Sequence, residues 1–248
     1  LEKGVLHRVQ ELDDEVREGY AAFDFQGVFQ KVFNFATVDL SAFYFDVRKD
    51  ALYCDADDSN FRLSALTVLD ILFHRLTTWL APILVFTTED VWLSRFGEGE
   101  ADGQEALSSV HLRDFPEPRP EWANPMLGVG VEKVRQVRRV VTAALELRRQ
   151  EKEIGSSLEA APTVHLKDKE MVDLLNNVNF ADVCIASQIQ LTTDPAPEGA
   201  FTLDDVADVA VVFALAEGEK CQRCWKILPD VGTHSHPGTC ARCDHALG

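Results

Sequence analysis

Four cysteines near the C-terminus have the residue types and the spacing of a metal site. They form two Cys-x-x-Cys pairs, Cys221 with Cys224 and Cys240 with Cys243, and 15 residues separate the pairs. This spacing is typical of structural zinc sites, in which each pair supplies two thiolates to one tetrahedral ion. Because four protein ligands leave no coordination position for a catalytic water, the sequence predicts one structural Zn²⁺ and no catalytic residue.

The residues between the two pairs offer little else that could fold this segment. They include Pro229, Gly232, Pro237 and Gly238, and they are too polar to bury a core of their own. Metal binding at such sites supplies about 10–16 kcal/mol of folding free energy, so loss of one ligand should unfold the tail. Three nearby histidines are alternative ligands, although the cysteines already complete a tetrahedron: His234, His236 and His245.

The cysteine pattern also bears on the compartment. Paired cysteines at this spacing favour metal binding in a reducing compartment over disulfides or thiol exchange. The two remaining cysteines, Cys54 and Cys184, stand alone and are expected in the core. No apolar run reaches 18 residues and no signal sequence is recognisable. We therefore expect a soluble, cytoplasmic piece of a longer protein.

A second group of residues has the character of a phosphate-binding surface. On a helix through residue 134, apolar side chains share one face, and arginines share the opposite one. A further two arginines and a tryptophan lie beside the cysteines, and cations with an aromatic ring suit phosphate and base contact. The ordinary alternative is a solvated face, with Glu146 partly neutralising it and Trp225 packed over the knuckle. The candidates for RNA contact are Arg135, Arg138, Arg139, Arg149, Arg223, Trp225 and Arg242.

The charge distribution limits what kind of nucleic-acid binding is expected. The formal net charge is −17, which argues against a protein that coats nucleic acid nonspecifically. Residues 1–120 contain 11 basic and 22 acidic residues, whereas residues 132–152 contain 7 basic and 3 acidic ones. A local basic segment on an acidic chain favours selective docking.

The element pattern places these groups in three parts. Residues 4–96 show helical periodicity, with apolar stripes through Val28, Val32, Phe35 and Phe43 and through Leu63, Leu66, Leu69, Phe73, Leu76 and Leu80, and with a break at Pro82. The phenylalanines at 23, 25, 29, 33, 35, 43 and 45 are interpreted as core residues. Residues 97–125 form a connection, and a helix over 127–152 precedes strands at 163–166, 182–191 and 206–215 and a helix at 169–177. The predicted domains are a helical bundle over 1–120, a small α/β junction domain over 121–216 and a zinc domain over 217–248.

Three stretches of the sequence go beyond general patterns. Residues 33–46 with 49–53 and 81–92 resemble the helical anticodon-binding domain of the class I synthetases for Ile, Val and Leu. Residues 144–148 with 152–160 resemble the stretch that follows this domain in isoleucyl-tRNA synthetases, and the cysteine tail resembles their zinc tail. Because the three occur in the family's order, the chain resembles the C-terminal part of a bacterial-type isoleucyl-tRNA synthetase.

The resemblance implies a mainly α fold, an anticodon-recognition role, tRNA as partner and a monomer. It also implies that ATP and isoleucine act only in the full-length enzyme, because both nucleotide-binding signatures of the family are absent here. We therefore expect this chain by itself not to aminoacylate tRNA. Two alternatives from other classes remain at this stage: a free-standing helical and zinc module that binds another protein, and a DNA-binding module of the repair type.

Overall fold

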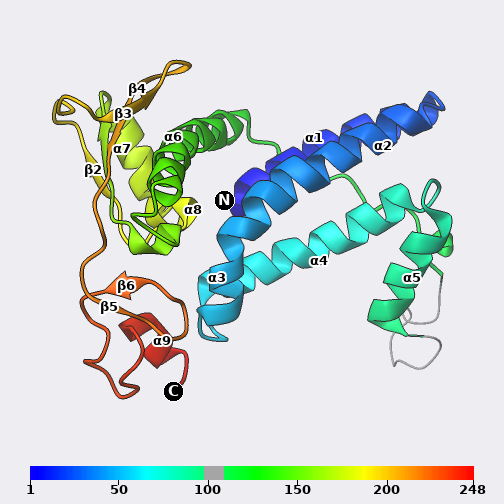
Figure 1. Ribbon diagram of the computed structural model, residues 1–248. Coiled ribbons are helices and arrows are strands. Elements are labelled where there is room, and N and C mark those ends of the chain that lie inside the picture. Colours follow the sequence, from blue (N-terminus) through cyan, green and yellow to red (C-terminus); the bar gives the residue numbers. More distant parts are fainter. Residues whose placement is uncertain (98–108) are drawn as a thin grey trace. The chain divides into compact units, whose positions relative to one another are not determined.

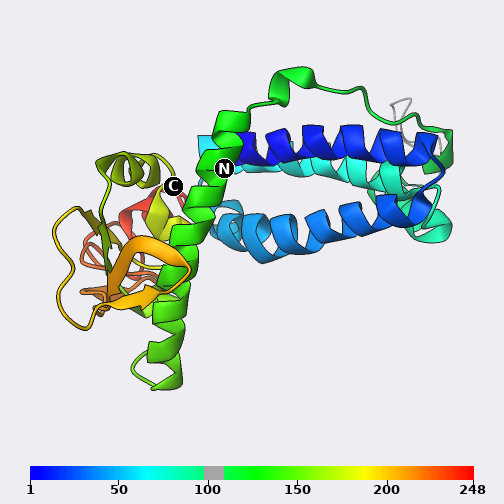
Figure 2. The ribbon, with the colours of Figure 1, turned by 90° about the horizontal axis from the view of Figure 1, so that it is seen from above.

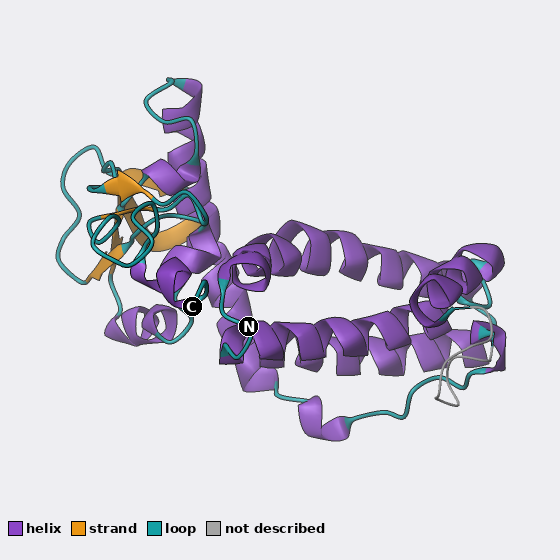
Figure 3. Cartoon of the chain, turned by 90° about the horizontal axis from the view of Figure 1, so that it is seen from below, coloured by secondary structure: helices purple, strands orange, loops and turns teal. Residues whose placement is uncertain are grey.

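The computed structural model describes residues 1–97 and 109–248. Most of these residues are helical, and the strands form one small sheet and a two-stranded ribbon (Figure 1 and Figure 3). The expected mainly α fold with a small α/β part is confirmed. The chain divides into two compact units, which we call the helical unit, Glu2–Asp46 with Leu63–Pro125, and the mixed unit, Leu1 with Val47–Arg62 and Met126–Gly248. None of the described helices has the length and hydropathy needed to cross a bilayer.

The helical unit is built on long helices that begin and end at recognisable residues. Helix α2 begins after Asp24, whose side chain accepts a hydrogen bond from the Gly27 amide at 2.9 Å. Figure 2 shows α2 beside α1. Helix α4 ends just before Pro82, as expected, and α5 ends at Gly97, whose φ of +79° terminates the helix. The elements that lie wholly or partly in this unit are α1 (Glu2–Ala21), α2 (Phe25–Asn34), η1 (Phe35–Phe45), α4 (Asn60–Leu80), α5 (Val85–Phe96), η2 (Val110–Leu112) and η3 (Pro120–Trp122).

The first predicted stripe is buried, but the second is not. Val28, Val32, Phe35 and Phe43 are all at most 6% exposed. On α4, by contrast, Leu63 and Leu66 of the predicted stripe are exposed. The residues that α4 buries instead are Ala65, Val68, Leu72, Arg75, Thr77, Thr78 and Trp79. The prediction failed because α4 is apolar on several sides and turns a charged residue, Arg75, toward the interior.

The interpretation of the phenylalanines as core residues is also partly wrong. Phe35 and Phe43 are buried, whereas five of the seven are exposed: Phe23, Phe25, Phe29, Phe33 and Phe45. The buried side of α2 is already occupied by Val28 and Val32, so Phe29 and Phe33 fall on its other side. There they stack on each other, with ring centroids 5.8 Å apart.

Of the connection predicted for 97–125, residues 98–108 lie outside the described residues. The described remainder contains η2 and η3, and its backbone is tied to the bundle. The Arg119 amide donates to the Gln10 side chain at 2.7 Å, and the Asn124 amide donates to Nδ1 of His7 at 3.2 Å. This connection is therefore part of the helical unit.

The mixed unit contains a four-stranded sheet in the order β2-β1-β4-β3. Strand β1 runs parallel to β2 and antiparallel to β4, with Val164 opposite Leu191 and Val211. The buried side chains of α6, among them Val137, Val141 and Leu145, provide the apolar face that was predicted. The elements outside the zinc tail are α3 (Asp46–Cys54), α6 (Pro125–Gln150), η4 (Ser157–Glu159), β1 (Thr163–Leu166), α7 (Lys169–Asn176), α8 (Phe180–Cys184), β2 (Gln190–Thr192), β3 (Phe201–Leu203) and β4 (Val206–Val212).

The strand predicted over 182–191 is wrong except for its last two residues. Residues Phe180–Cys184 form the short helix α8, and strand β2 begins only at Gln190. Phe180, Val183 and Cys184 are buried together at helical spacing. Ile185 then ends the helix in the left-handed region, with φ at +56°. The error arose because a run of five residues is too short to show a period clearly.

Candidate metal centre

The four predicted cysteines come together at one point. Their sulfur atoms all lie within 4.8 Å of one another, and all four residues are buried. Sγ of Cys224 and Sγ of Cys240 are 3.8 Å apart. A tetrahedral zinc with Zn–S bonds of about 2.3 Å requires sulfurs about 3.8 Å apart. The donor set therefore fits one structural Zn²⁺, which these four residues would hold as thiolates.

Tight turns bring each pair of sulfurs together. The tail is made of β5 (Glu219–Lys220), β6 (Ile227–Leu228) and α9 (Ala241–His245). In the first knuckle the Cys221 amide donates to the Lys226 carbonyl, and the Trp225 amide donates to the Cys221 carbonyl, both at 2.9 Å. This turn holds Trp225 at a φ of +67°, a left-handed conformation that is strained for a bulky residue.

The electrostatics of the cysteines favour a bound cation. Burial opposes ionisation of Cys221, but backbone amides of Cys224, Cys240 and Arg223 outweigh it and lower the pKa of Cys221 to about 6. Burial raises the pKa of Cys224 to about 11, and burial with the neighbouring thiols raises the pKa of Cys243 as well. Four thiolates this close repel one another, so a divalent ion is needed to hold them all ionised.

Two of the three histidines considered as alternative ligands, His234 and His236, interact with carboxylates. His234 Nε2 lies 3.1 Å from an Asp230 carboxylate oxygen, and His236 Nδ1 lies 2.8 Å from an Asp244 one. Asp230 also accepts from the Ala241 amide at 2.7 Å, at the start of α9. Among the described residues, the four cysteines are the group whose ligand atoms lie close enough together to hold one metal ion.

Three of the four arginines predicted on the α6 surface contact other groups of the mixed unit: Arg138, Arg139 and Arg149. Arg138 is half-buried, and its Nε donates to the Val183 carbonyl in α8 at 2.8 Å. Arg139 and Arg149 are exposed and form ion pairs with Asp205, at 2.7 Å, and with Glu146. Arg135 is half-buried on the same helix. The basic face is thus partly neutralised by carboxylates.

Trp225 lies at the surface of the zinc tail. Its side chain is 61% exposed, so it does not serve as a cover buried over the knuckle. The Lys220 ammonium lies 5.7 Å from the centre of its ring, which places a cation beside an accessible aromatic face.

The other two tail candidates, Arg223 and Arg242, contact a distant segment of the mixed unit. Arg242 forms ion pairs with Asp50 at 2.5 Å and with Asp55 at 3.3 Å. Arg223 donates to the Cys54 carbonyl and, at 3.1 Å, to the Tyr53 carbonyl. Sequence reasoning missed these partners, because they precede the tail by about 170 to 190 residues and no local pattern links them.

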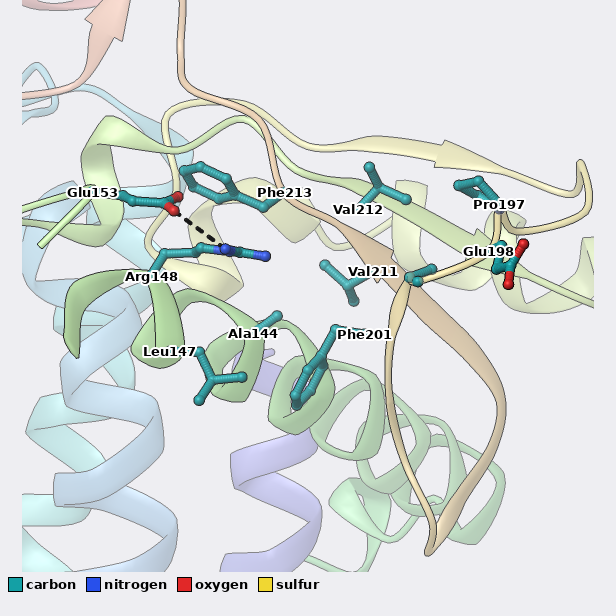
Figure 4. Close-up of a pocket in the computed structure, with 12 residues that line it drawn as sticks. Ala144, Leu147, Arg148, Glu153, Pro197, Glu198, Phe201, Val211, Val212 and Phe213 are labelled. Carbon is teal, nitrogen blue, oxygen red and sulfur yellow. Dashed lines mark hydrogen bonds and ion pairs between the residues drawn. The ribbon is translucent and has the colours of Figure 1, made fainter. Parts of the chain in front are cut away.

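A cavity of about 400 Å³ lies between α6 and the strands β3 and β4. Figure 4 shows the side chains of Leu147, Phe201 and Val211 on its apolar walls, with Arg148 and Phe213 at one end. The Arg148 guanidinium lies 5.6 Å from the centre of the Phe213 ring. Glu153 pairs with Arg148 at 3.3 Å, and Glu151 does so at 2.9 Å. Since these carboxylates balance the cation, the cavity is not built for an anion.

Comparisons with known proteins agree with this architecture. Residues 2–165 match the family described as anticodon-binding domain of tRNA ligase, and residues 218–246 match the zinc finger found in FPG and IleRS. The chain is 63% identical to an isoleucine–tRNA ligase of Ruegeria pomeroyi, 51% to one of Agrobacterium fabrum and 44% to one of Bartonella henselae. All of the chain is covered in each case, along with 25% of the relative.

The chain thus spans about a quarter of the length of the curated relatives that it matches. The zinc finger alone would not distinguish a ligase from a repair protein, because its family includes both FPG and IleRS. The match along the whole chain favours the ligase over both alternatives. The chain therefore belongs to the family of tRNA ligase anticodon-binding domains, in the form that isoleucine–tRNA ligases carry together with this zinc finger.

Proposed function

We propose that this chain is the tRNA-binding part of an isoleucine–tRNA ligase and that it recognises the anticodon of isoleucine tRNA. The observation that carries the proposal is the match to the anticodon-binding family over residues 2–165, combined with similarity to isoleucine–tRNA ligases along the whole chain. The complete ligase would join isoleucine to its tRNA at the expense of ATP. Isoleucine and ATP would bind to parts of the ligase that this chain does not cover. We further propose that the protein is a cytoplasmic monomer.

The proposed division of labour follows the predicted domains. The helical bundle over 1–120 and the junction domain over 121–216 would present the RNA-binding surface, and the domain over 217–248 would be held by its zinc. The acidic balance of the bundle would disfavour indiscriminate binding of phosphate, because like charges repel.

The proposed RNA contacts lie on α6 and on the tail. Arg139, Arg149 and Trp225 are exposed, so phosphates and bases can reach them without unfolding the protein. Arg135 and Arg138 are half-buried on the same helix and would support the same surface. Contact of RNA with Arg223 and Arg242 stays a prediction that competes with their contacts to residues 50–55.

The experiment is a binding titration with isoleucine tRNA transcript and a noncognate tRNA over a salt series, on protein whose zinc content is measured. Preferential, salt-sensitive binding by protein with one zinc is expected. Arg139→Gln with Arg149→Gln should weaken binding and reduce the salt slope by about 1 to 2. Lys167→Gln is the matched control, since Lys167 is also exposed and ion-paired, with Asp208 at 3.2 Å.

Two outcomes would contradict the proposal. Equal affinity for both tRNAs by folded, metallated protein would remove the claim of specific recognition. An unchanged salt slope in the double variant would remove Arg139 and Arg149 from the RNA-binding surface.

A further inference from the structure

The zinc tail contacts the C-terminal end of α3 through the residues that lie inside its own Cys-x-x-Cys turns. Arg223 stands between Cys221 and Cys224, and Arg242 stands between Cys240 and Cys243. One arginine from each turn therefore reaches the same segment of the mixed unit, residues 50–55. Figure 1 shows α3 within reach of β6 and α9.

The two arginines meet groups that a helix end leaves without partners. The last carbonyls of any helix have no intrahelical donor, and its C-terminus favours a nearby cation. Arg223 donates to the carbonyls of Tyr53 and Cys54, the last two residues of α3. Arg242 binds Asp50 in the last turn of α3 and Asp55 just beyond it. Asp55 is buried, and its carboxylate accepts hydrogen bonds from Arg242 and from the Ser59 hydroxyl.

Apolar packing accompanies these polar contacts. Cys54 is 7% exposed and belongs to one buried cluster with the four metal-site cysteines. Its sulfur lies 3.8 Å from the Arg223 carbonyl oxygen. The end of α3 therefore lies directly against the first knuckle, and displacement of a cysteine sulfur there would disturb the packing of Cys54.

The tail also contacts the region of α8, through the two residues that follow Trp225. Lys226 forms an ion pair with Asp182, and the Ile227 amide donates to the Ser187 hydroxyl at 2.7 Å. The tail thus holds two segments of the mixed unit that are far apart in sequence, residues 50–55 and residues 182–187. Neither link belongs to the hydrogen bonding of a helix or a sheet.

We propose that Arg223 and Arg242 are positioning residues, through which the zinc-bound tail fastens the C-terminal end of α3. Metal binding fixes both Cys-x-x-Cys turns and so sets the two arginines at once, whereas without metal neither turn has a fold of its own. Order at residues 47–55 then depends on zinc, although none of these residues is a ligand. This inference does not rest on the proposed tRNA binding and can be tested without RNA.

The test is hydrogen exchange of this chain, measured for peptides covering residues 47–55 with zinc bound and after chelation. Exchange there should rise together with exchange in the tail, while peptides of the β1–β4 sheet change little. Arg242→Gln with metal bound should raise exchange at 47–55 by about tenfold or more, because it removes charged hydrogen bonds. Lys220→Gln, the control, changes an exposed cation of the same tail and should have no effect at 47–55.

Cobalt substitution separates positioning from damage to the metal site. Arg242→Gln should keep the thiolate-to-cobalt absorption of the parent chain, and Arg242→Lys should restore part of the protection at 47–55. If Arg242→Gln fails to bind cobalt, Asp50→Asn breaks the same link from α3 and leaves both turns intact. Unchanged exchange at 47–55 after chelation, or in Asp50→Asn with metal bound, would overturn the proposal.

Discussion

Arg75 and Asp13 form a buried ion pair inside the helical unit. Arg75 on α4 is 3% exposed, and its guanidinium donates to the Asp13 carboxylate at 2.8 Å and to the Glu117 carbonyl at 2.7 Å. Asp13 is fully buried and also accepts from Arg17 at 2.8 Å. Burial lowers the pKa of Arg75, against the opposing effect of Asp13. The two charges are therefore stabilised by their close contact and by their hydrogen bonds. Either charge alone would be costly at this buried position, because it would be removed from water without a partner.

Arg75→Met should destabilise the helical unit by about 3–5 kcal/mol, the usual cost of breaking a buried pair from one side. The lower end is expected, because Arg17 still neutralises Asp13. At about 2–4 °C per kcal/mol for a chain of this size, the melting temperature should fall by about 6–12 °C. Thermal and urea unfolding followed by circular dichroism measure both quantities.

Two further variants make this reasoning testable. Replacing both partners, Arg75→Met with Asp13→Leu, should cost less than Arg75→Met alone, because it also removes the buried Asp13 carboxylate, which the single variant leaves paired with the more exposed Arg17. Arg119→Met is the control, since Arg119 forms an exposed pair with Glu121 at 3.6 Å and should change stability by less than about 1 kcal/mol. If Arg75→Met costs no more than Arg119→Met, the pair does not hold the bundle together.

Three other predictions follow from the tail and from α2. Removal of zinc by a chelator should open residues 217–248 to proteolysis while β1–β4 stays resistant; uniform resistance would show that the tail folds without metal. Trp225→Gly should stabilise the metallated tail by about 1 kcal/mol, because glycine tolerates the positive φ. It should also weaken tRNA binding by about 1–3 kcal/mol, because a stacking ring is lost. A less stable tail, or tighter tRNA binding, would refute the prediction. Phe29→Gln with Phe33→Gln should cost less than about 1 kcal/mol in urea unfolding, whereas Phe35→Ala, at a buried site, should cost about 3–5 kcal/mol; comparable losses would contradict the burial described.

The features predicted correctly from the sequence are those specified by neighbouring residues. The spacing of the four cysteines was sufficient to find the metal site, and β1 was placed at Thr163–Leu166 as observed. The long helix α6 also has a strong period over 26 residues. The cysteine spacing is specific, and the helix pattern of α6 is long. Such a feature can be identified from its own residues, without knowledge of what packs against it.

The features that were missed depend on contacts between distant residues. The buried face of α4 includes Arg75, whose partner Asp13 lies 62 residues earlier, and no count of apolar residues on α4 could reveal this pair. The exposure of Phe29 and Phe33 follows from the burial of Val28 and Val32 against neighbouring helices. The partners of Arg242 lie 187 and 192 residues away. Residue type and spacing describe what a helix face offers, whereas only the fold decides which face is covered.

The basic residues around the proposed RNA surface differ in how readily phosphate can recruit them. Arg139 and Arg149 are held by exposed carboxylates of Asp205 and Glu146, and surface pairs of this kind contribute only about 0–1 kcal/mol. Phosphate can therefore replace the carboxylate at little cost. Arg242 is bound to two carboxylates, one of them the buried Asp55. Burial by itself would lower the pKa of Arg242, but the hydrogen bond and ion pair with Asp50 outweigh it and raise that pKa. A phosphate would have to break a structural link to reach it, so in the proposed complex with tRNA the exposed Arg139 and Arg149 would exchange partners more readily than Arg242.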